Sequence, residues 1–167
     1  MPEIKIIRST RRRRTASARE VGDVIEVRVP SGLGAAEEAR IVARLVRRVT
    51  NRTTGAEIDL TARTKALAAR FALPTPAAIK WVDNQTSRWG SCTPATSTIR
   101  LSHTLATFPG WVLDYVIVHE LAHLEVHGHG PAFWQIVARY PLTERARGFL
   151  IAKGLEQADD QSAPIGG

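Results

Sequence analysis

A glutamate and two histidines form an H-E-x-x-H pattern in the second half of the chain: His119, Glu120 and His123. Residues four apart lie on one face of a helix, so both imidazoles can point at a single Zn²⁺ ion. Glu120 is then placed to take a proton from a water that the zinc activates. The pattern therefore predicts a hydrolytic zinc site, which needs a third protein ligand and one open position.

Two histidines further along the chain compete for the role of third ligand, His127 and His129. A helix running on to His127 would place the ends of the histidine row about 12 Å apart, whereas zinc–nitrogen bonds are about 2 Å long. Gly128 and Gly130 flank His129 and offer a helix break. We therefore predict that the chain turns at Gly128 and brings His129 to the metal, with His127 left as a solvated neighbour of the site.

The segments around this pattern show two apolar periodicities, one typical of strands and one typical of helices. Period-2 alternation predicts strands, and apolar positions three and four apart predict helices. We expect strands at 3–8, 24–29, 79–84, 86–92 and 98–102, and helices at 36–52, 57–71, 131–140 and 143–157, besides the metal-binding helix. The first two strands are expected to pair, and the last three to form an antiparallel meander. The predicted class is α+β, followed by a disordered tail at 158–167.

Length and composition are those of an ordinary globular protein. The chain has 167 residues, 44% of them hydrophobic, which suits one domain. It shows neither a secretory signal at its start nor an apolar run of membrane-spanning length. Cys92 is the only cysteine, so an intrachain disulfide is excluded, and we expect a cytoplasmic protein. Cys92 as a zinc ligand is conceivable, but a small buried residue is the role that we favour.

The chain carries a net charge of +7, and arginines gather near its start, including the run Arg11, Arg12, Arg13 and Arg14. Such a cluster can bind phosphate backbones by releasing counterions, so nucleic acid is a candidate partner. The alternatives are a solvated basic strand or turn, or a source of salt bridges to acidic residues elsewhere in the chain. Aromatic residues do not interleave with these arginines, so the usual platform for stacking single-stranded bases is missing.

The spacing of the three histidines alone does not decide the class of zinc protease. It equals that of metzincins, H-E-x-x-H-x-x-G-x-x-H. Metzincins need a glycine where this chain has Val126, and a downstream methionine turn, whereas the only methionine here is Met1. That class is therefore disfavoured.

The motifs instead resemble those of the YgjP-like zinc metallopeptidases, which are related to the SprT-like group. The shared motifs are W-G-S-C at 89–92, Y-V at 115–116, H-E-L-A-H-L at 119–124 and H-G-P-A-F-W at 129–134. The resemblance extends over nearly the whole chain except the tail, and it implies a zincin-like metallopeptidase domain over 1–157. One departure is Gly128-His129-Gly130, where members often have Asn-His-Ser; it leaves the ligand in place but can change the hydrogen bonds around it.

The implied activity is zinc-dependent hydrolysis of peptide bonds with Glu120 as general base, in an H-E-x-x-H peptidase of the gluzincin or SprT-like type. Candidate donors to the oxyanion are Tyr115, Arg88 and His127. A rival from another class is a nucleic-acid-binding protein whose zinc is structural and whose site is closed by His103 or Cys92. A hybrid is a DNA-associated, SprT-like protease recruited through its arginines.

Two predicted strand segments near the H-E-x-x-H pattern indicate where a substrate would bind. Thr98–Ser102 directly precedes the metal-binding helix, and as an edge strand it would offer its backbone to an extended peptide. The competing possibility is that this segment is a central strand, paired on both sides. Gly90 within a strand indicates a bulge or a close backbone approach beside the active site.

Overall fold

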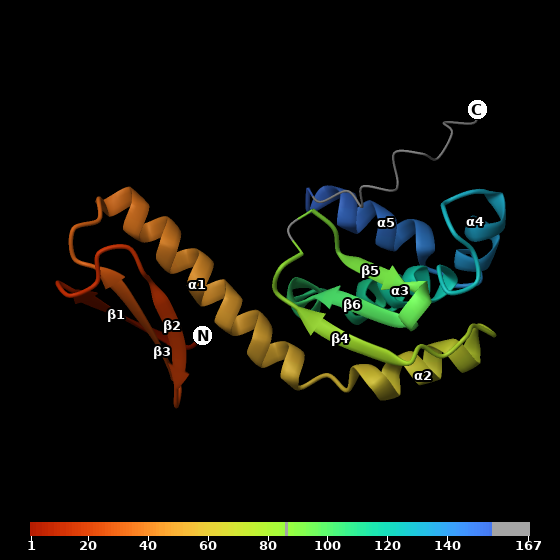
Figure 1. The fold of residues 1–167 in the computed structure, drawn as a ribbon, viewed down its shortest axis with the longest axis horizontal. Coiled ribbons are helices and arrows are strands. Elements are labelled where there is room, and N and C mark those ends of the chain that lie inside the picture. Colours follow the sequence, from red (N-terminus) through yellow and green to blue (C-terminus); the bar gives the residue numbers. More distant parts are fainter. Residues whose placement is uncertain (86, 155–167) are drawn as a thin grey trace. The chain divides into compact units, whose positions relative to one another are not determined.

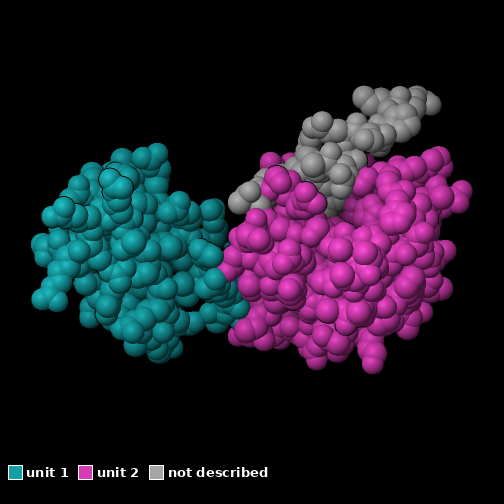
Figure 2. Space-filling view, in the orientation of Figure 1, with its two compact units in different colours: residues 1–54 teal, residues 55–167 magenta. Residues whose placement is uncertain are grey.

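The computed structural model describes residues 1–85 and 87–154, and its chain divides into two compact units, Met1–Thr54 and Gly55–Gly167 (Figure 2). Each unit combines a three-stranded mixed sheet with helical structure. The predicted α+β class is thus confirmed. The predicted tail at 158–167 lies outside the described residues.

The first unit is a small sheet with one long helix. Its strands are β1 (Glu3–Ser9), β2 (Ser17–Val21) and β3 (Val24–Pro30), in the order β1-β3-β2. β1 pairs with β3, which confirms the predicted pairing of the segments 3–8 and 24–29. This pairing is parallel, whereas β2 pairs with β3 antiparallel. The sequence does not reveal β2, because Ala18, opposite Val27, is the only residue of this strand that is not exposed.

The core of this unit follows from the alternation along β3, whose Ile25, Val27 and Val29 are all buried. They pack with Val42 of α1 (Ala35–Ala56), which is longer than the predicted helix at 36–52. An amphipathic helix of this kind is held in place by its apolar stripe rather than by propensity alone. On the face of α1 opposite Val42, Arg40, Arg44 and Arg47 are exposed.

The sheet of the second unit contains β4 (Ala78–Val82), β5 (Gly90–Thr93) and β6 (Thr98–Ser102), in the order β4-β6-β5. β4 pairs with β6 in parallel, and β5 pairs with β6 antiparallel. The predicted antiparallel meander is therefore wrong: only β5 and β6 form a hairpin, around the 3₁₀ turn Pro94–Thr96, while the link from β4 to β5 crosses to the far side of β6.

The central position of β6 has a direct consequence for substrate binding. Ile99 and Leu101 in this strand are 0% exposed, and both edges of β6 are hydrogen-bonded to neighbours. A peptide cannot add to a strand that is already paired on both sides. The predicted docking of substrate along Thr98–Ser102 is therefore wrong.

Helices surround this sheet: α2 (Leu60–Arg70), α3 (Gly110–Ala122), α4 (Pro131–Val137) and α5 (Thr143–Ala152), with a 3₁₀ turn at His103–Thr107 before α3. α3 is the central helix, and it contacts α2, α4, α5 and β5 (Figure 1). Apart from Asp114, every residue from Val112 to Ala122 is buried, as expected of a helix enclosed in a core. The described helices include none that is long and apolar enough to span a bilayer.

Two contacts fix α3 against its neighbours. Arg63 on α2 forms an ion pair with Asp114 at 2.6 Å, and the Tyr140 hydroxyl donates a hydrogen bond to the Trp111 carbonyl at 2.8 Å. Burial, followed by the negative charge of Asp114, raises the pKa of Tyr140 to about 12. The helix that carries the H-E-x-x-H pattern is thus anchored at its first turns, away from the histidines.

Candidate metal centre

Three histidine side chains converge at the C-terminal end of α3. His119 lies in the last turn of the helix, His123 caps it, and His129 follows in the loop before α4. The Nε2 atoms of His123 and His129 are 3.1 Å apart, and those of His129 and His119 are 3.3 Å apart. The structure therefore brings together the three residues that the sequence singled out as ligands.

The loop between His123 and His129 reverses the chain over a short distance. α3 ends at Ala122, and three backbone bonds, from Leu124 to Leu121 and from Glu125 and Val126 to Ala122, tighten its final turn. Gly128 then adopts a φ of +77°, which an L side chain rarely tolerates. The predicted turn at Gly128 is confirmed, and it is the step that returns His129 to the helix end.

Hydrogen bonds orient the two helical imidazoles. Nδ1 of His123 lies 3.2 Å from the Val126 carbonyl, which can only accept, so Nδ1 carries the proton and Nε2 keeps its lone pair. Nδ1 of His119 lies 3.4 Å from the Tyr115 hydroxyl, one helical turn earlier. The Nε2 atoms that face one another are thus the ones left to bind a ligand.

Aromatic packing holds the same rings from the side. Phe133 on α4 is fully buried and stacks on His123, with ring centroids 4.5 Å apart. Its ring centroid also lies 4.9 Å from that of His119 and 4.7 Å from that of His129, both in edge-on contact. One phenylalanine therefore limits the rotation of all three imidazoles.

The electrostatic environment keeps His119 neutral. Its side chain is 1% exposed, and burial lowers its pKa well below the ordinary value of 6.5, with further lowering from His123 and His129. A neutral imidazole is the form that binds a metal ion. His119 is therefore prepared to accept a metal cation rather than a proton.

The nitrogen spacing can be compared with that of a metal site. Zinc–nitrogen bonds of about 2.0–2.1 Å in tetrahedral geometry separate neighbouring ligand atoms by about 3.3–3.4 Å. The two distances between Nε2 atoms, 3.1 and 3.3 Å, come close to this separation. The three histidines thus fit a single ion of this kind.

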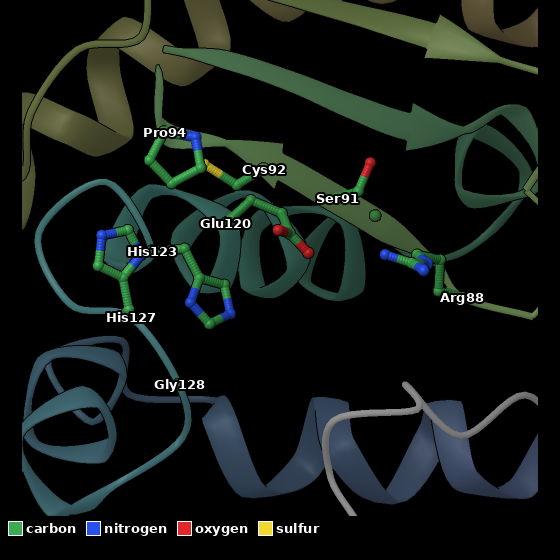
Figure 3. Close-up of a pocket in the computed structure, with 9 residues that line it drawn as sticks. Arg88, Ser91, Cys92, Pro94, Glu120, His123, His127 and Gly128 are labelled. Carbon is green, nitrogen blue, oxygen red and sulfur yellow. The ribbon is translucent and has the colours of Figure 1, made fainter. Parts of the chain in front are cut away.

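Glu120 is buried beside the cluster at 3% exposure, and its carboxylate points into a pocket between His123 and Arg88 (Figure 3). The backbone of Gly90 in β5 lies directly against it. A Cβ atom added at Gly90 would stand 2.8 Å from Oε1 of Glu120. The close approach predicted for Gly90 is therefore confirmed, and the group that occupies the space is the carboxylate itself.

The pocket in front of Glu120 has a volume of about 170 Å³. It is formed by β5, the end of α3 and the loop after it, and its lining residues are Arg88, Gly90, Ser91, Cys92, Pro94, Glu120, His123, His127 and Gly128. Of the three candidate oxyanion donors, Arg88 and His127 line this pocket and Tyr115 does not. Tyr115 is 2% exposed and contacts His119 instead.

Two residues are candidates for a fourth protein ligand that would close the site. His103 makes its contacts elsewhere: its Nδ1 lies 2.8 Å from a carboxylate oxygen of Asp83, and its ring stacks on Trp81. Cys92 lines the pocket, but it is not part of the group whose ligand atoms converge. Burial, followed by the charge of Glu120, raises the pKa of its thiol to about 11, so the thiol is protonated at neutral pH.

The contacts that support the histidine cluster were not predicted from the sequence. Tyr115 precedes His119 by four residues, so helical spacing places both on one face and could have indicated the contact. Phe133 stood out only as part of a motif. The guanidinium of Arg147 lies 4.4 Å from the centre of the Trp134 ring, and its charge contributes to the lowered pKa of His119; α5 carries no pattern that points to this role.

Comparisons with known proteins show the family and the fold of the chain. The model of the family described as "YgjP-like, metallopeptidase domain" matches residues 4–150. Among solved structures, the crystal structure of the metallopeptidase zymogen of Pyrococcus abyssi abylysin matches with a TM-score of 0.51 and 18% sequence identity, covering 56% of this chain and 92% of that chain. At this identity the likeness concerns the fold. Curated proteins gave no significant match.

Proposed function

Because the chain belongs to the YgjP-like metallopeptidase family, we propose that it hydrolyses peptide bonds with a zinc ion held by His119, His123 and His129 and with Glu120 as general base. The family membership confirms the resemblance that the motifs indicated, and it makes the chain a metal-dependent protease. The observation that supports the finer proposal is the convergence of three Nε2 atoms beside a buried carboxylate.

The choice of zinc follows from the chemistry of the three donor groups. Three imidazoles suit Zn²⁺, and the contacts of the Nδ1 atoms of His119 and His123 turn the Nε2 atoms toward the ion. A bound Zn²⁺ would lower the pKa of the water bound to it and would polarise the carbonyl group under attack. The position opposite the three imidazoles would stay open, since neither His103 nor Cys92 joins the cluster.

The proposed role of Glu120 is to hold and move a proton. Its carboxylate would accept the proton of the attacking water and pass it to the nitrogen of the leaving amine. Gly90 supports this role because the missing side chain leaves room for the carboxylate at the pocket wall. Arg88 and His127, which also line the pocket, are the proposed donors to the oxygen of the carbonyl under attack.

The strand proposed to pair with an extended substrate is β5, in place of β6. Among the described strands, β5 is at an edge of its sheet and pairs on one side only, with β6. Its Gly90 contacts Glu120, so a peptide paired with the outer edge of β5 would pass the proposed general base. Recognition through the backbone makes little demand on side chains, so we expect the enzyme to prefer extended, unfolded segments.

The test is the Glu120→Gln variant, because an amide has nearly the same shape as a carboxylate but cannot take a proton from water. We expect a loss of peptide cleavage of about 10²- to 10⁴-fold with zinc content unchanged. Glu125→Gln is the matched control, since Glu125 is exposed at the same helix end. Wild-type cleavage by Glu120→Gln would overturn the proposed role of Glu120, and a zinc-free wild-type protein that cleaves peptides would overturn the choice of metal.

A further inference from the structure

The net charge of the chain is confined to the first of the two units. Residues 1–54 contain 13 Lys and Arg against six Asp and Glu, which gives +7, whereas residues 55–167 contain ten of each and are neutral. The unit that carries the metal centre is thus balanced in charge, and the small sheet with its long helix is strongly basic. The charge is not spread as it would be if it served only the solubility of the whole protein.

Some of these basic side chains are neutralised within the unit. Arg8 forms two hydrogen bonds with the carboxylate of Glu38, at 2.6 and 2.9 Å, and Arg19 bonds Glu26 at 3.0 Å. Six other exposed arginines of this unit form no ion pair with a residue in 1–85 or 87–154: Arg11, Arg13, Arg14, Arg40, Arg44 and Arg47. Salt bridges within the unit therefore account for part of the basic charge only.

The six unpaired arginines come from two elements that meet. Arg40, Arg44 and Arg47 recur every three or four residues along α1, so they form a stripe about 10 Å long on one helix face. Val42 on the opposite face is buried against the sheet, so the stripe points away from the core. The other three lie in the loop that follows β1.

Two contacts place that loop beside the start of the helix. The ion pair between Arg8 and Glu38 joins the end of β1 to the first turns of α1, and the amide of Ser31 bonds the carbonyl of Ser9. The arginine loop therefore begins next to the N-terminal end of the stripe. Loop and stripe together form one surface, which we call the arginine surface.

The composition of the arginine surface selects among polyanions. All six side chains are guanidinium groups, whose paired donors match the geometry of phosphate oxygens better than an ammonium does. Residues 1–54 contain no aromatic side chain, so unstacked bases would find no platform. The exposed large apolar residues of this unit lie outside α1, so the stripe offers nothing to insert into a lipid bilayer.

We propose that the arginine surface binds the phosphate backbone of double-stranded nucleic acid without reading its sequence. Duplexes carry the densest line of phosphates, about one charge per 1.7 Å of axis, and binding them requires only the guanidinium groups that this surface presents.

Binding can be measured with the full-length protein and a fluorescein-labelled duplex of about 30 base pairs, as anisotropy over a range of salt concentrations. Six phosphate contacts give a slope of log K against log salt of about −5, and about a thousandfold loss of affinity between roughly 50 and 200 mM salt. Duplex DNA and duplex RNA of the same length distinguish the two sources of the phosphates. A single strand of that sequence is expected to bind more weakly at every salt concentration.

Matched triple variants locate the binding surface. Replacing Arg40, Arg44 and Arg47 with Gln keeps helix propensity and should reduce the slope by about half. Replacing Lys65, Lys80 and Arg100, exposed in the neutral unit, removes the same three charges and should leave the slope unchanged. Both variants should retain cleavage of a short peptide.

Three results would overturn the proposal. These are no binding of duplex at about 50 mM salt, equal weakening by the two triple variants, or binding of phosphatidylserine vesicles in preference to duplex. The assay needs neither zinc nor a peptide, so its outcome is independent of the proposed peptidase activity. A chain that binds duplex but does not cleave peptides would refute only the proposed function, and the converse would refute only the arginine surface.

Discussion

Gly90 and Glu120 face each other so closely that a single methyl group would not fit between them: an added Cβ would stand 2.8 Å from Oε1 of the carboxylate. The atom in the way is the far end of a flexible side chain, so the Gly90→Ala variant should fold with a stability change below about 1 kcal/mol. Its carboxylate must move, however, and we expect peptide cleavage to fall about tenfold to a hundredfold. Zinc content should not change, since the histidines are not displaced.

A second glycine separates this effect from the general consequences of adding a methyl group. Gly148 lies within α5 with open space around its Cα, so Gly148→Ala should keep full activity and gain about 0.5–1 kcal/mol from the lower backbone entropy of the unfolded chain. Full activity in Gly90→Ala would show that Glu120 works from a position other than the one seen against β5.

The two histidines that follow the helix should differ sharply in metal binding. His129→Ala removes one of the three converging nitrogens. Removing a residue that only hydrogen-bonds a metal ligand lowers metal affinity by about 10- to 100-fold, so we expect removal of the ligand itself to lower zinc affinity by more than about a hundredfold. His127 is exposed at the pocket rim, so His127→Ala should keep its zinc and lose only cleavage rate. Competition with a chromogenic chelator measures both affinities. Normal affinity in His129→Ala with loss in His127→Ala would reverse the assignment.

The convergence of the three histidines could be predicted from sequence because it depends on local geometry. The spacing of His119 and His123 needs only a helix, and the glycine at 128 marks the turn that returns His129. These contacts join residues that are close along the chain. The pairing of strands was harder, since β6 could be the edge or the centre of its sheet with the same alternation of residues.

The supporting contacts of the site were not predictable for a related reason. Gly90 meets Glu120 from a distant part of the sequence, and the glycine alone indicates a close approach without naming the partner. The sequence showed arginines gathered near its start, but not that the whole net charge of +7 belongs to one compact unit. Only the boundary between the units, after Thr54, shows where that charge lies.

The turn before His129 offers a direct test of backbone strain. Gly128 has a φ of +77°, so Gly128→Ala should cost about 1–2 kcal/mol of stability and weaken zinc binding as the loop relaxes. Gly130 has a φ of −77° and nothing within 4 Å of an added Cβ, so Gly130→Ala should be nearly neutral. Thermal unfolding with and without zinc measures both effects. Equal behaviour of the two variants would mean that the positive φ at Gly128 is not required.

The raised pKa of Tyr140 should make the second unit sensitive to alkali. The folded protein holds its proton up to about pH 12, whereas an unfolded tyrosine loses it near its ordinary pKa of 10.0. Between these values the unfolded state binds fewer protons, so stability falls as pH rises, and the contribution is fully present below pH 10. Tyr140→Phe keeps the ring packing with Phe71 but loses the bond to the Trp111 carbonyl, at a cost of about 1 kcal/mol at neutral pH. Denaturant unfolding at a series of alkaline pH values should therefore show the wild-type advantage shrinking above pH 10, and parallel profiles for the two proteins would contradict the shift.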